Sequence, residues 1–538
     1  MLSASNISLR FGKRVLFEDV NVKFTKGNCY GVIGANGAGK STFMKILAGE
    51  IESTTGRVEI SPGERMSVLK QNRFEFEEST VLETVLMGFK ELYEVKHGMD
   101  EIYAKPDFSD ADGMKVADLQ NKFDEMGGWT AESDAAELIS NLGVTEVNHR
   151  RLMKEVDANV KVRVLLAQAL FGNPDVLIMD EPTNDLDTET IMWLENFLAD
   201  YENTVIVVSH DRHFLDAVCT HIADLDRQKM NIYSGNYTFW YESSQLASKQ
   251  LADKNKKAEQ RKAELMDFIA RFSANASKAK QATSRKKALD KLDLDKIQPS
   301  SRRYPGIVFK MQREVGDQIL RVDSLTASVE GEMLFKDVSF TVEHGHKITL
   351  ISKNSLATTT LYQILAGKAE ADKGTVNWGV TVTPSYIPND NSEYFDGIDL
   401  SLVDWLRQFS KEKDETFIRG FLGRMLFSGE ESLKSAKVLS GGEKVRCLLS
   451  KIMLEEGNFL LLDEPTSHLD LEAITTYNTS LINFPSNIIF TSQDHQFTQT
   501  IANRVIEITP KGMIDKLMPY DDYLLDPEVI ALRAELYS

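Results

Sequence analysis

The chain of 538 residues has few of the features that mark secreted, metal-binding or membrane proteins. Its three cysteines, Cys29, Cys219 and Cys447, lie far apart and form no CxxC pair, so neither a disulfide framework nor a metal site is expected. A membrane-spanning helix needs about eighteen consecutive apolar residues, and no stretch of the sequence is that long. The first residues also lack the basic and then apolar pattern of a secretory signal. These absences indicate a cytoplasmic protein without a membrane part.

Lys and Arg, 62 in all, are outnumbered by 81 Asp and Glu, but one segment is net positive. The net charge is −19, whereas residues 248–303 hold 16 Lys and Arg against 7 Asp and Glu. A charge run is commonly only a solvated surface, but this one opposes the charge of the rest of the chain. It therefore indicates a local contact with a polyanion. The segment has no ladder of aromatic residues, which favours contact with phosphates over reading of bases.

The sequence contains two copies of one unit, which is the pattern of a duplicated domain. GVIGANGAGKSTFMKILAGE at 31–50 is echoed by LISKNSLATTTLYQILAGK at 350–368. VLIMDEPTNDLD at 176–187 is echoed by FLLLDEPTSHLD at 459–470. A chain of this length also exceeds a single core, so two related domains are expected.

The first motif reads as a strand, a glycine-rich turn and a helix. GANGAGKST at 34–42 has the GxxxxGK[ST] spacing of a P-loop, whose backbone N–H groups surround phosphates at a helix N-terminus. Lys40 is expected to reach the β- and γ-phosphates of ATP, and Ser41 to bind Mg²⁺. The apolar runs 176–179 and 459–462 are typical of buried parallel strands. Each ends in Asp-Glu, which offers a magnesium ligand and a neighbouring base.

Together with LSGGE at 439–443, these motifs resemble the ATP-binding-cassette superfamily over nearly the whole chain. In that family the LSGGQ-like signature of one domain closes over the ATP held by the P-loop of the other. The expected fold class is therefore α/β, with two P-loop nucleotide-binding domains that pair head to tail within one monomeric chain.

The resemblance also places the remaining nucleotide-contacting positions. Phe11 is the expected adenine-stacking aromatic, Gln71 the Q-loop glutamine and His210 the switch histidine. At the same distances from the motifs, the second copy has Val329, Asn389 and Gln493 in place of these three residues. In the other direction, the signature residue Ser440 of the second copy corresponds to Asp157 of the first. These equal spacings fix the register between the two copies.

The first P-loop and the second signature keep the family's residues. By resemblance, Glu181 polarises the attacking water, Asp180 supports Mg²⁺ and His210 contacts the γ-phosphate. Gln71 links metal and water to the rest of the domain, and with Lys40 these residues form the expected catalytic and metal-binding set. The residues expected to bind ATP are Phe11, Gly34, Asn36, Gly37, Ala38, Gly39, Lys40, Ser41, Thr42, Ser440, Gly441, Gly442 and Glu443. Because phosphoryl transfer depends on positioning and charge neutralisation, a working site needs the whole set.

The second P-loop and the first signature have lost these residues. Ser352, Ser355 and Ala357 replace glycines, and Thr358 replaces the lysine. Each added Cβ hinders close approach of the backbone, and the main counter-charge is gone. We expect this second site to be non-hydrolytic and to bind nucleotide weakly or only structurally. Its residues are Val329, Ser352, Asn354, Thr358, Thr359, Asn389, Asp463, Glu464, Gln493 and Asp157.

Two segments lie outside the repeated motifs. Between Q-loop and signature the first copy is 35 residues longer. The addition, at about 89–129, predicts a helical hairpin broken at Pro106 and Gly113, or alternatively a species-specific surface elaboration. Residues 241–304 predict a basic helical hairpin between domains 1–240 and 305–525, with a short tail at 526–538. The linker residues expected to contact RNA are Arg271, Lys278, Lys280, Arg285, Lys286 and Lys287.

Two cassettes joined by a charged linker, without a membrane span, resemble the ABC-F family. RFSANASKAKQATSRKKALDKL at 271–292 and EVKxxxDxIYAxP at 94–106 resemble the YbiT type. The resemblance implies an ATPase that binds the E site of the 70S ribosome, with its linker near rRNA and the P-site tRNA and its insert as a ribosome-contacting arm. ATP would hold the bound form and hydrolysis would release it. The implied roles are translational regulation and possible protection against ribosome-targeting antibiotics. The family has two competent sites, so the loss of one departs from its usual cycle.

The sequence is also compatible with two other functions. The chain could be the ATPase subunit of a membrane transporter, or a cassette protein that binds DNA or RNA without ribosomes. Co-sedimentation with ribosomes, membranes or free nucleic acid distinguishes the three.

Overall fold

The computed structural model describes the chain apart from residues 13, 36, 71, 73, 106, 185, 248, 330 and 538 and, between 251 and 301, all positions but 253, 260 and 266. The side chains of Phe11, Arg14 and Thr188 also lie outside the description. The chain divides into two compact units. One comprises Met1–Pro182, Leu194–Ser209 and Phe214–Ser301; the other comprises Thr183–Trp193, His210–His213 and Arg302–Ser538.

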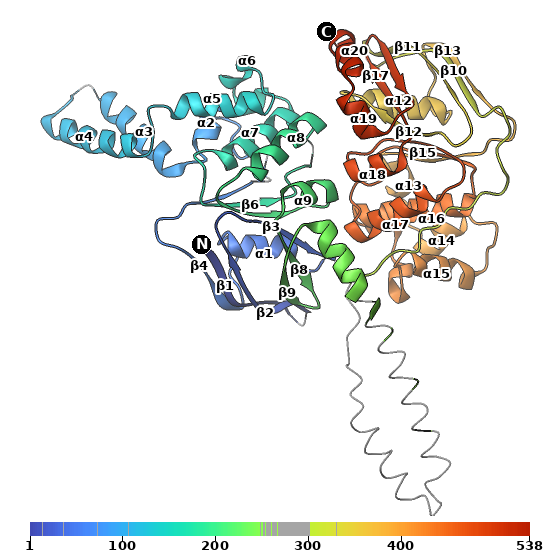
Figure 1. Ribbon diagram of the computed structural model, residues 1–538, viewed down its shortest axis with the longest axis horizontal. Coiled ribbons are helices and arrows are strands. Elements are labelled where there is room, and N and C mark those ends of the chain that lie inside the picture. Colours follow the sequence, from blue (N-terminus) through green and yellow to red (C-terminus); the bar gives the residue numbers. More distant parts are fainter. Residues whose placement is uncertain are drawn as a thin grey trace, which may run out of the picture. The chain divides into compact units, whose positions relative to one another are not determined.

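The first repeat is built on a six-stranded sheet of order β5-β6-β7-β3-β8-β9 (Figure 1). Its strands are β3 (Cys29–Gly34), β5 (Met66–Val68), β6 (Val176–Asp180), β7 (Thr204–Val208), β8 (His221–Asp226) and β9 (Lys229–Ser234). Neighbours are parallel except for the β8–β9 hairpin. The central strands β3 and β7 are fully buried, as expected for parallel strands covered on both faces.

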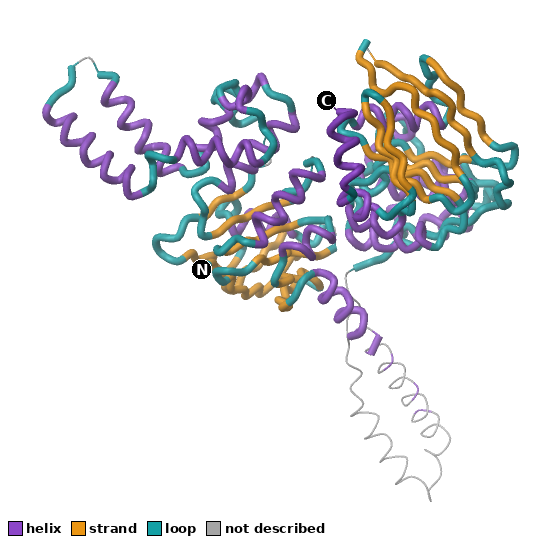
Figure 2. The backbone as a smooth tube through the Cα atoms, turned by 45° about the horizontal axis from the view of Figure 1, so that its top comes forward, coloured by secondary structure: helices purple, strands orange, loops and turns teal. Residues whose placement is uncertain are grey.

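A smaller antiparallel sheet and a set of helices complete this repeat (Figure 2). The sheet has the order β2-β1-β4, with β1 (Leu2–Phe11), β2 (Arg14–Phe24) and β4 (Thr55–Ile60). The helices are α1 (Lys40–Leu47), α2 (Val81–Leu86), α3 (Lys90–Tyr103), α4 (Asp110–Glu125), α5 (Ala131–Asn141), α6 (Glu146–His149), the 3-10 helix η1 (Met153–Glu155), α7 (Ala158–Leu170), α8 (Thr188–Ala199) and α9 (Arg212–Val218). Phe17, Phe43 and Ile178 belong to one core cluster, which joins both sheets to α1.

The second repeat has the same architecture. Its larger sheet has the order β14-β15-β16-β12-β17-β18 and its smaller sheet β11-β10-β13. The strands are β10 (Leu320–Val329), β11 (Glu332–Val342), β12 (Lys347–Ile351), β13 (Lys373–Trp378), β14 (Pro384–Ile387), β15 (Phe459–Leu462), β16 (Asn487–Phe490), β17 (Arg504–Thr509) and β18 (Gly512–Lys516). The predicted duplication, the α/β fold and the two buried parallel strands at 176–179 and 459–462 are therefore confirmed.

The helices of the second repeat include one that follows each motif and two near the C-terminal end. They are α12 (Ser355–Leu365), α13 (Ser392–Phe395), α14 (Leu402–Arg407), α15 (Glu415–Arg424), η2 (Gly429–Leu433), η3 (Ala436–Val438), α16 (Gly441–Glu455), α17 (Leu471–Ile482), α18 (His495–Ile501), α19 (Tyr520–Leu525) and α20 (Pro527–Tyr537).

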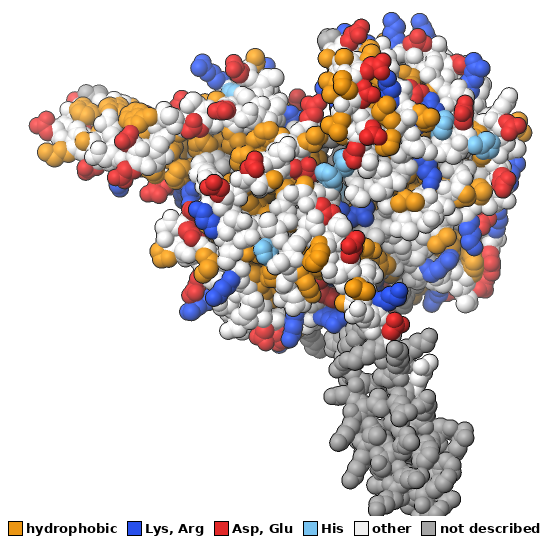
Figure 3. Space-filling model, in the orientation of Figure 1, with side chains coloured by type: hydrophobic (Ala, Val, Ile, Leu, Met, Phe, Trp, Pro, Cys, Tyr) orange, Lys and Arg blue, Asp and Glu red, His pale blue; other side chains and the backbone are white. Residues whose placement is uncertain are grey.

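The insert of the first repeat holds the antiparallel helices α3 and α4 (Figures 1 and 2). The expected break at Gly113 is wrong, because Gly113 lies inside α4. A helix tolerates one glycine at a cost of about 1 kcal/mol, and the capping box of Ser109 and Asp112 fixes the start of α4 just before it. Hydrophobic side chains gather on the surface of this hairpin (Figure 3). Four large ones are more than half exposed: Tyr103, Phe108, Met114 and Trp129.

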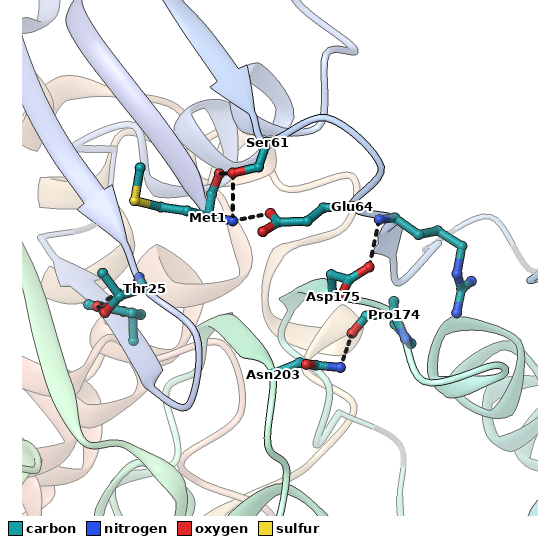
Figure 4. A network of polar contacts seen from close by, with 9 residues as sticks. Met1, Thr25, Ser61, Glu64, Pro174, Asp175 and Asn203 are labelled. Atoms are coloured by element: carbon teal, nitrogen blue, oxygen red, sulfur yellow. Dashed lines mark hydrogen bonds and ion pairs between the residues drawn. The ribbon is translucent and has the colours of Figure 1, made fainter.

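The first residue is tied into the first repeat by polar contacts (Figure 4). The Met1 ammonium pairs with Glu64 and donates to Ser61 Oγ at 3.2 Å. The adjacent Arg65 N–H donates to Asp175 Oδ2 at 2.8 Å. These contacts link the edge of the smaller sheet to the loop that leads into β6.

The predicted linker falls mostly outside the described residues. Residues 237–247 are helical, and the six basic residues expected at the linker tip, Arg271 to Lys287, are not among those described. In the part of the chain that is described, no helix is both long enough and apolar enough to cross a membrane.

Candidate nucleotide sites

The first P-loop connects the buried strand β3 to α1 through left-handed glycines. Gly37 and Gly39 have φ values of 75° and 105°, a backbone conformation that other L-residues rarely adopt. A Cβ at Gly39 would lie 3.2 Å from the Phe17 ring, and one at Gly34 would lie 2.6 Å from the Leu225 carbonyl oxygen. The loop therefore requires glycine at these positions, and it keeps the curled form that phosphate binding needs.

Lys40 begins α1 and lies against the loop. Its Nζ donates to the Gly34 carbonyl at 2.8 Å, and the residue is 8% exposed. Ser41 and Thr42 follow in the first turn, while Ala38 donates its N–H to the Ala35 carbonyl at 3.0 Å. The positive end of the helix dipole and the lysine thus meet at one point, which is suited to an anion.

The second loop has a different backbone. Its helix α12 begins at Ser355, which corresponds to Gly37, whereas α1 begins only at Lys40. Asn354 caps α12 by accepting the Leu356 N–H at 3.0 Å. None of residues 352–359, all of which are described, has a left-handed φ. The sequence predicted a crowded loop, but the structure replaces that loop with one further turn of helix, because residues with a Cβ prefer helical backbone to the left-handed one.

The side chain that replaces the lysine faces this extra turn. Thr358 is 6% exposed, and its Oγ1–H donates to the Ser355 carbonyl oxygen at 2.8 Å. It brings no positive charge to the loop. The second repeat therefore lacks both the curled backbone and the counter-charge for phosphate.

The second Asp-Glu pair sits in a hydroxyl network at the end of β15. Thr359 Oγ1 donates to Asp463 Oδ2 at 2.9 Å, and Thr491 Oγ1 donates to Asp463 Oδ1 at 3.2 Å. Burial raises the pKa of Asp463, although these two hydroxyls and the Asn389 N–H act in the opposite direction. Thr491 replaces Val208 of the first repeat, which is the only sequence signal for this unpredicted contact.

Glu464 is held beside it. Its N–H donates to Thr491 Oγ1 at 3.0 Å, and its Oε2 accepts the Gln493 N–H at 3.3 Å. Burial, together with the charge of Asp463, raises the pKa of Glu464 to about 7. This site therefore favours the protonated carboxyl more than an ordinary glutamate does.

The first Asp-Glu pair has the same backbone form. Asp180 ends β6, and Glu181 follows with φ 53°, close to the 48° of Glu464. The Glu181 N–H donates to the Val208 carbonyl at 2.8 Å. Both glutamates thus hold a left-handed backbone, which costs about 1–2 kcal/mol for a residue with a Cβ. His210 follows β7 and is half-buried.

The second signature caps the long helix α16. Ser440 Oγ accepts the Glu443 N–H at 3.4 Å, while Glu443 Oε2 accepts the Ser440 N–H at 2.9 Å. Burial raises the pKa of Glu443, but the Ser440 N–H and the Lys434 ammonium outweigh it, so the pKa is lowered. A Cβ at Gly442 would lie 2.6 Å from the His468 carbonyl oxygen. In the first repeat Asp157 takes the N-cap position of α7 without a side-chain cap bond.

The remaining predicted residues either lie in the second repeat or have side chains that the structure does not describe. Val329 ends β10 and packs against the core of the second repeat, whereas Asn389 and Gln493 are exposed. Asn36, Gln71 and the side chain of Phe11 lie outside the described residues.

Comparisons with known proteins agree with this geometry. A family model described as ABC transporter matches residues 17–184 and 335–467, and a second model with the same description matches residues 223–309. The chain is 60% identical to the uncharacterised ABC transporter ATP-binding protein YkpA of Bacillus subtilis, over 100% of both chains. It is 46% identical to the probable ATP-binding protein YbiT of Escherichia coli O157:H7, over 97% of this chain and 99% of that one.

Solved structures with a similar fold are also tandem proteins. The archaeal ribosome recycling factor aABCE1, in complex with a ribosomal stalk protein, aligns with a TM-score of 0.60 and 17% identity over 99% of this chain and 92% of its own. A protein titled RNase-L Inhibitor aligns with a TM-score of 0.59 and 18% identity over 94% and 87%. With two cassettes, full-length relatives and a preserved first P-loop, the chain belongs to the ABC-F family of ATP-binding-cassette ATPases, YbiT type.

Proposed function

We propose that this ATPase works on the ribosome, bound near the E site, and hydrolyses ATP at one composite site. The single hydrolytic site rests on the contrast between a preserved first P-loop and a second loop rebuilt as helix. The archaeal recycling factor that shares the tandem fold is described as ribosome-bound in a further structure, with a TM-score of 0.54 and 17% identity over 95% of this chain and 78% of that one. A ribosomal site of action also fits the expected cytoplasmic location.

Within the working site, each side chain has one task. Lys40 supplies positive charge at the loop where α1 begins, Glu181 orients the attacking water and His210 contacts the γ-phosphate. Gln71 relays the state of the site to the rest of its domain. Activity then depends on holding these groups in place around the phosphates.

The residues at the end of β6 and the start of α1 fit Mg²⁺. In the second repeat the equivalent hydroxyl and carboxylate, Thr359 and Asp463, lie 2.9 Å apart, so Ser41 and Asp180 can share one cation. Oxygen ligands of this kind suit Mg²⁺, which commonly takes one or two protein ligands and completes its shell with phosphates and water. When bound, Mg²⁺ would neutralise phosphate charge, with Ser41, Asp180 and Gln71 holding it.

The second signature completes the composite site in this proposal. Ser440, Gly441 and Gly442 stand at the N-terminus of α16, where backbone N–H groups favour an anion. ATP joins the first P-loop to this signature and holds the ribosome-bound form, and hydrolysis releases it. The degenerate second site leaves the cycle with a single hydrolytic step.

The two added segments supply the ribosome contacts. The basic residues 248–303 would meet rRNA and the P-site tRNA, because a concentrated positive charge binds phosphates. The hairpin of α3 and α4, with its exposed hydrophobic side chains (Figure 3), would act as the arm. Protection against ribosome-targeting antibiotics would be one consequence of this binding.

Ribosome co-sedimentation tests the proposal. The Glu181→Gln variant binds ATP without hydrolysing it, so it should pellet with 70S ribosomes when ATP is present and stay in the supernatant without it. The Lys40→Ala variant is the matched control and should remain in the supernatant under both conditions. If Glu181→Gln pellets instead with membranes or with free RNA, the ribosomal proposal fails and the corresponding alternative replaces it.

A further inference from the structure

The C-terminal helix α20 lies against the second P-loop. The Lys353 N–H, which belongs to that loop, donates to Tyr537 Oη at 3.3 Å. The Lys353 ammonium lies 4.7 Å from the centre of the Tyr537 ring, within the range of a cation–π contact. Tyr537 Oη in turn donates to the Ile508 carbonyl at 3.2 Å. One side chain of α20 thus joins the loop to β17.

Helix α20 is anchored by a buried charge and an apolar contact. Arg533 Nε donates to Glu507 Oε1 at 3.0 Å, and Tyr523 Oη donates to Glu507 Oε2 at 2.6 Å. The Glu507 side chain is 1% exposed, so it depends on both partners. Leu532 and Leu536 pack on the same small core as Ile351, the residue that ends β12 just before the loop. The helix is therefore a fixed part of this end of the repeat.

Four N–H groups of the loop are already used inside the chain. Those of Lys353, Asn354, Leu356 and Ala357 donate respectively to Tyr537 Oη, Ser352 Oγ, Asn354 Oδ1 and the Asn354 carbonyl. A P-loop binds phosphate by offering such groups to it. A nucleotide would have to break these bonds, unwind the first turn of α12 and bind without a lysine.

We infer that the second P-loop binds no nucleotide. The first turn of α12 and Tyr537 of α20 occupy the backbone groups that would otherwise bind phosphate. This inference deepens the proposed single-site function, because the chain then carries one ATP per cycle. The second cassette contributes its signature and a permanently closed loop. The inference about nucleotide binding does not depend on ribosome binding.

Nucleotide stoichiometry tests the first part of the inference. Equilibrium dialysis of the full-length Glu181→Gln protein with Mg·ATP, without ribosomes, should saturate at one ATP per chain. Adding Lys40→Ala to it should leave less than about a tenth of a nucleotide bound. A second ATP, or one retained after Lys40→Ala, overturns the inference while leaving the ribosomal proposal intact. Cross-linking with 8-azido-ATP, whose reactive group is on the adenine, followed by peptide mapping gives an independent reading. It should label no peptide that contains Val329, the residue at the adenine-stacking position, and none from residues 347–365.

Hydrogen exchange tests the role of α20. The amide of Lys353 should be protected without nucleotide and unchanged by Mg·ATP, whereas amides of the first P-loop should gain protection. Tyr537→Phe should speed exchange at Lys353 about fivefold, the effect of losing one neutral hydrogen bond. Tyr394→Phe, a tyrosine elsewhere in the second repeat, is the matched control and should leave Lys353 unchanged. Equal exchange at Lys353 in all three proteins overturns the part played by Tyr537.

Discussion

The two P-loops occupy the same place in the same fold and differ in what their backbones can do. Both follow the fourth strand in the order of a six-stranded sheet, β3 or β12, and both lead into a helix. The first keeps left-handed glycines and a lysine, whereas the second continues its helix through the equivalent positions. Since the sheet order is unchanged, the cassette fold does not depend on phosphate binding. The backbone of the loop, and not the sheet, distinguishes the repeat suited to phosphate binding from the other.

The largest expected difference between the repeats is in catalysis. Glu181→Gln should lower the ATP turnover rate at least about 100-fold, because the group that orients water is lost. The matched change Glu464→Gln should leave the rate within about twofold. Steady-state release of phosphate measures both. Comparable losses in the two variants would contradict the assignment of a single hydrolytic site.

The second repeat should carry a pH-dependent stability that comes from Glu464. Its pKa rises from 4.5 to about 7 on folding. The contribution of protonated Glu464 to the free energy of unfolding is therefore fully present below pH 4.5 and is lost as pH rises to about 7. Glu464→Gln should remove this loss and stabilise the protein at pH 8 by up to about 3 kcal/mol.

Urea unfolding at pH 5 and pH 8 measures this effect, with the exposed Glu412→Gln as control. Burial also raises the pKa of Asp463, so this residue too makes the free energy of unfolding fall as pH rises. Both variants keep Asp463 and therefore keep this part of the pH dependence. A pH dependence of Glu464→Gln equal to that of the parent would show that Glu464 titrates normally.

The two loops should respond oppositely to exchange of glycine and alanine. Gly39→Ala places a Cβ in a left-handed backbone beside Phe17, which costs about 1–2 kcal/mol and should weaken ATP binding about tenfold. Ala357→Gly should cost about 1 kcal/mol of stability, since glycine disfavours helix, and leave ATP binding unchanged. Calorimetric titration with Mg·ATP and thermal unfolding separate the two. Weaker ATP binding in Ala357→Gly would mean that the second loop does hold nucleotide.

The smallest expected effect is at Thr359. Thr359→Ala removes the hydroxyl that donates to Asp463 at 2.9 Å and should lower the free energy of unfolding by about 1 kcal/mol. Thr359→Ser keeps the hydroxyl and should behave as the parent does in urea unfolding. A loss of stability in Thr359→Ser as large as in Thr359→Ala would show that the methyl group matters instead.

Much of the fold could be predicted from the sequence, because repeated motifs fix the register of the two copies. The apolar runs before each Asp-Glu pair predicted β6 and β15, and GANGAGKST predicted the loop between β3 and α1. The early start of α12 could not be predicted in the same way. Asn354 is shared with the first loop as Asn36, and only the backbone shows that it becomes a helix cap.

The contacts that could not be predicted are those between residues distant in sequence. Lys353 and Tyr537 are 184 positions apart, and no spacing rule joins them. The bond from the Thr491 hydroxyl to Asp463 joins residues 28 positions apart and matches no motif spacing. Local pattern predicts elements and motifs, whereas such pairings depend on how distant segments pack.

The strand order of the larger sheets also determines when each repeat can finish folding during synthesis. Strand β3 lies between β7 and β8, so it lacks one neighbour until the chain has been made to Asp226, and the sheet is complete only with β9, which ends at Ser234. Strand β12 likewise waits for β16 and β17, which end at Thr509. Until then the buried face of β12 lacks its neighbours and is open to wrong pairing. A nonsense mutation within β17 would therefore leave the second repeat without a complete sheet, whereas one after Lys516 would leave all six strands in place.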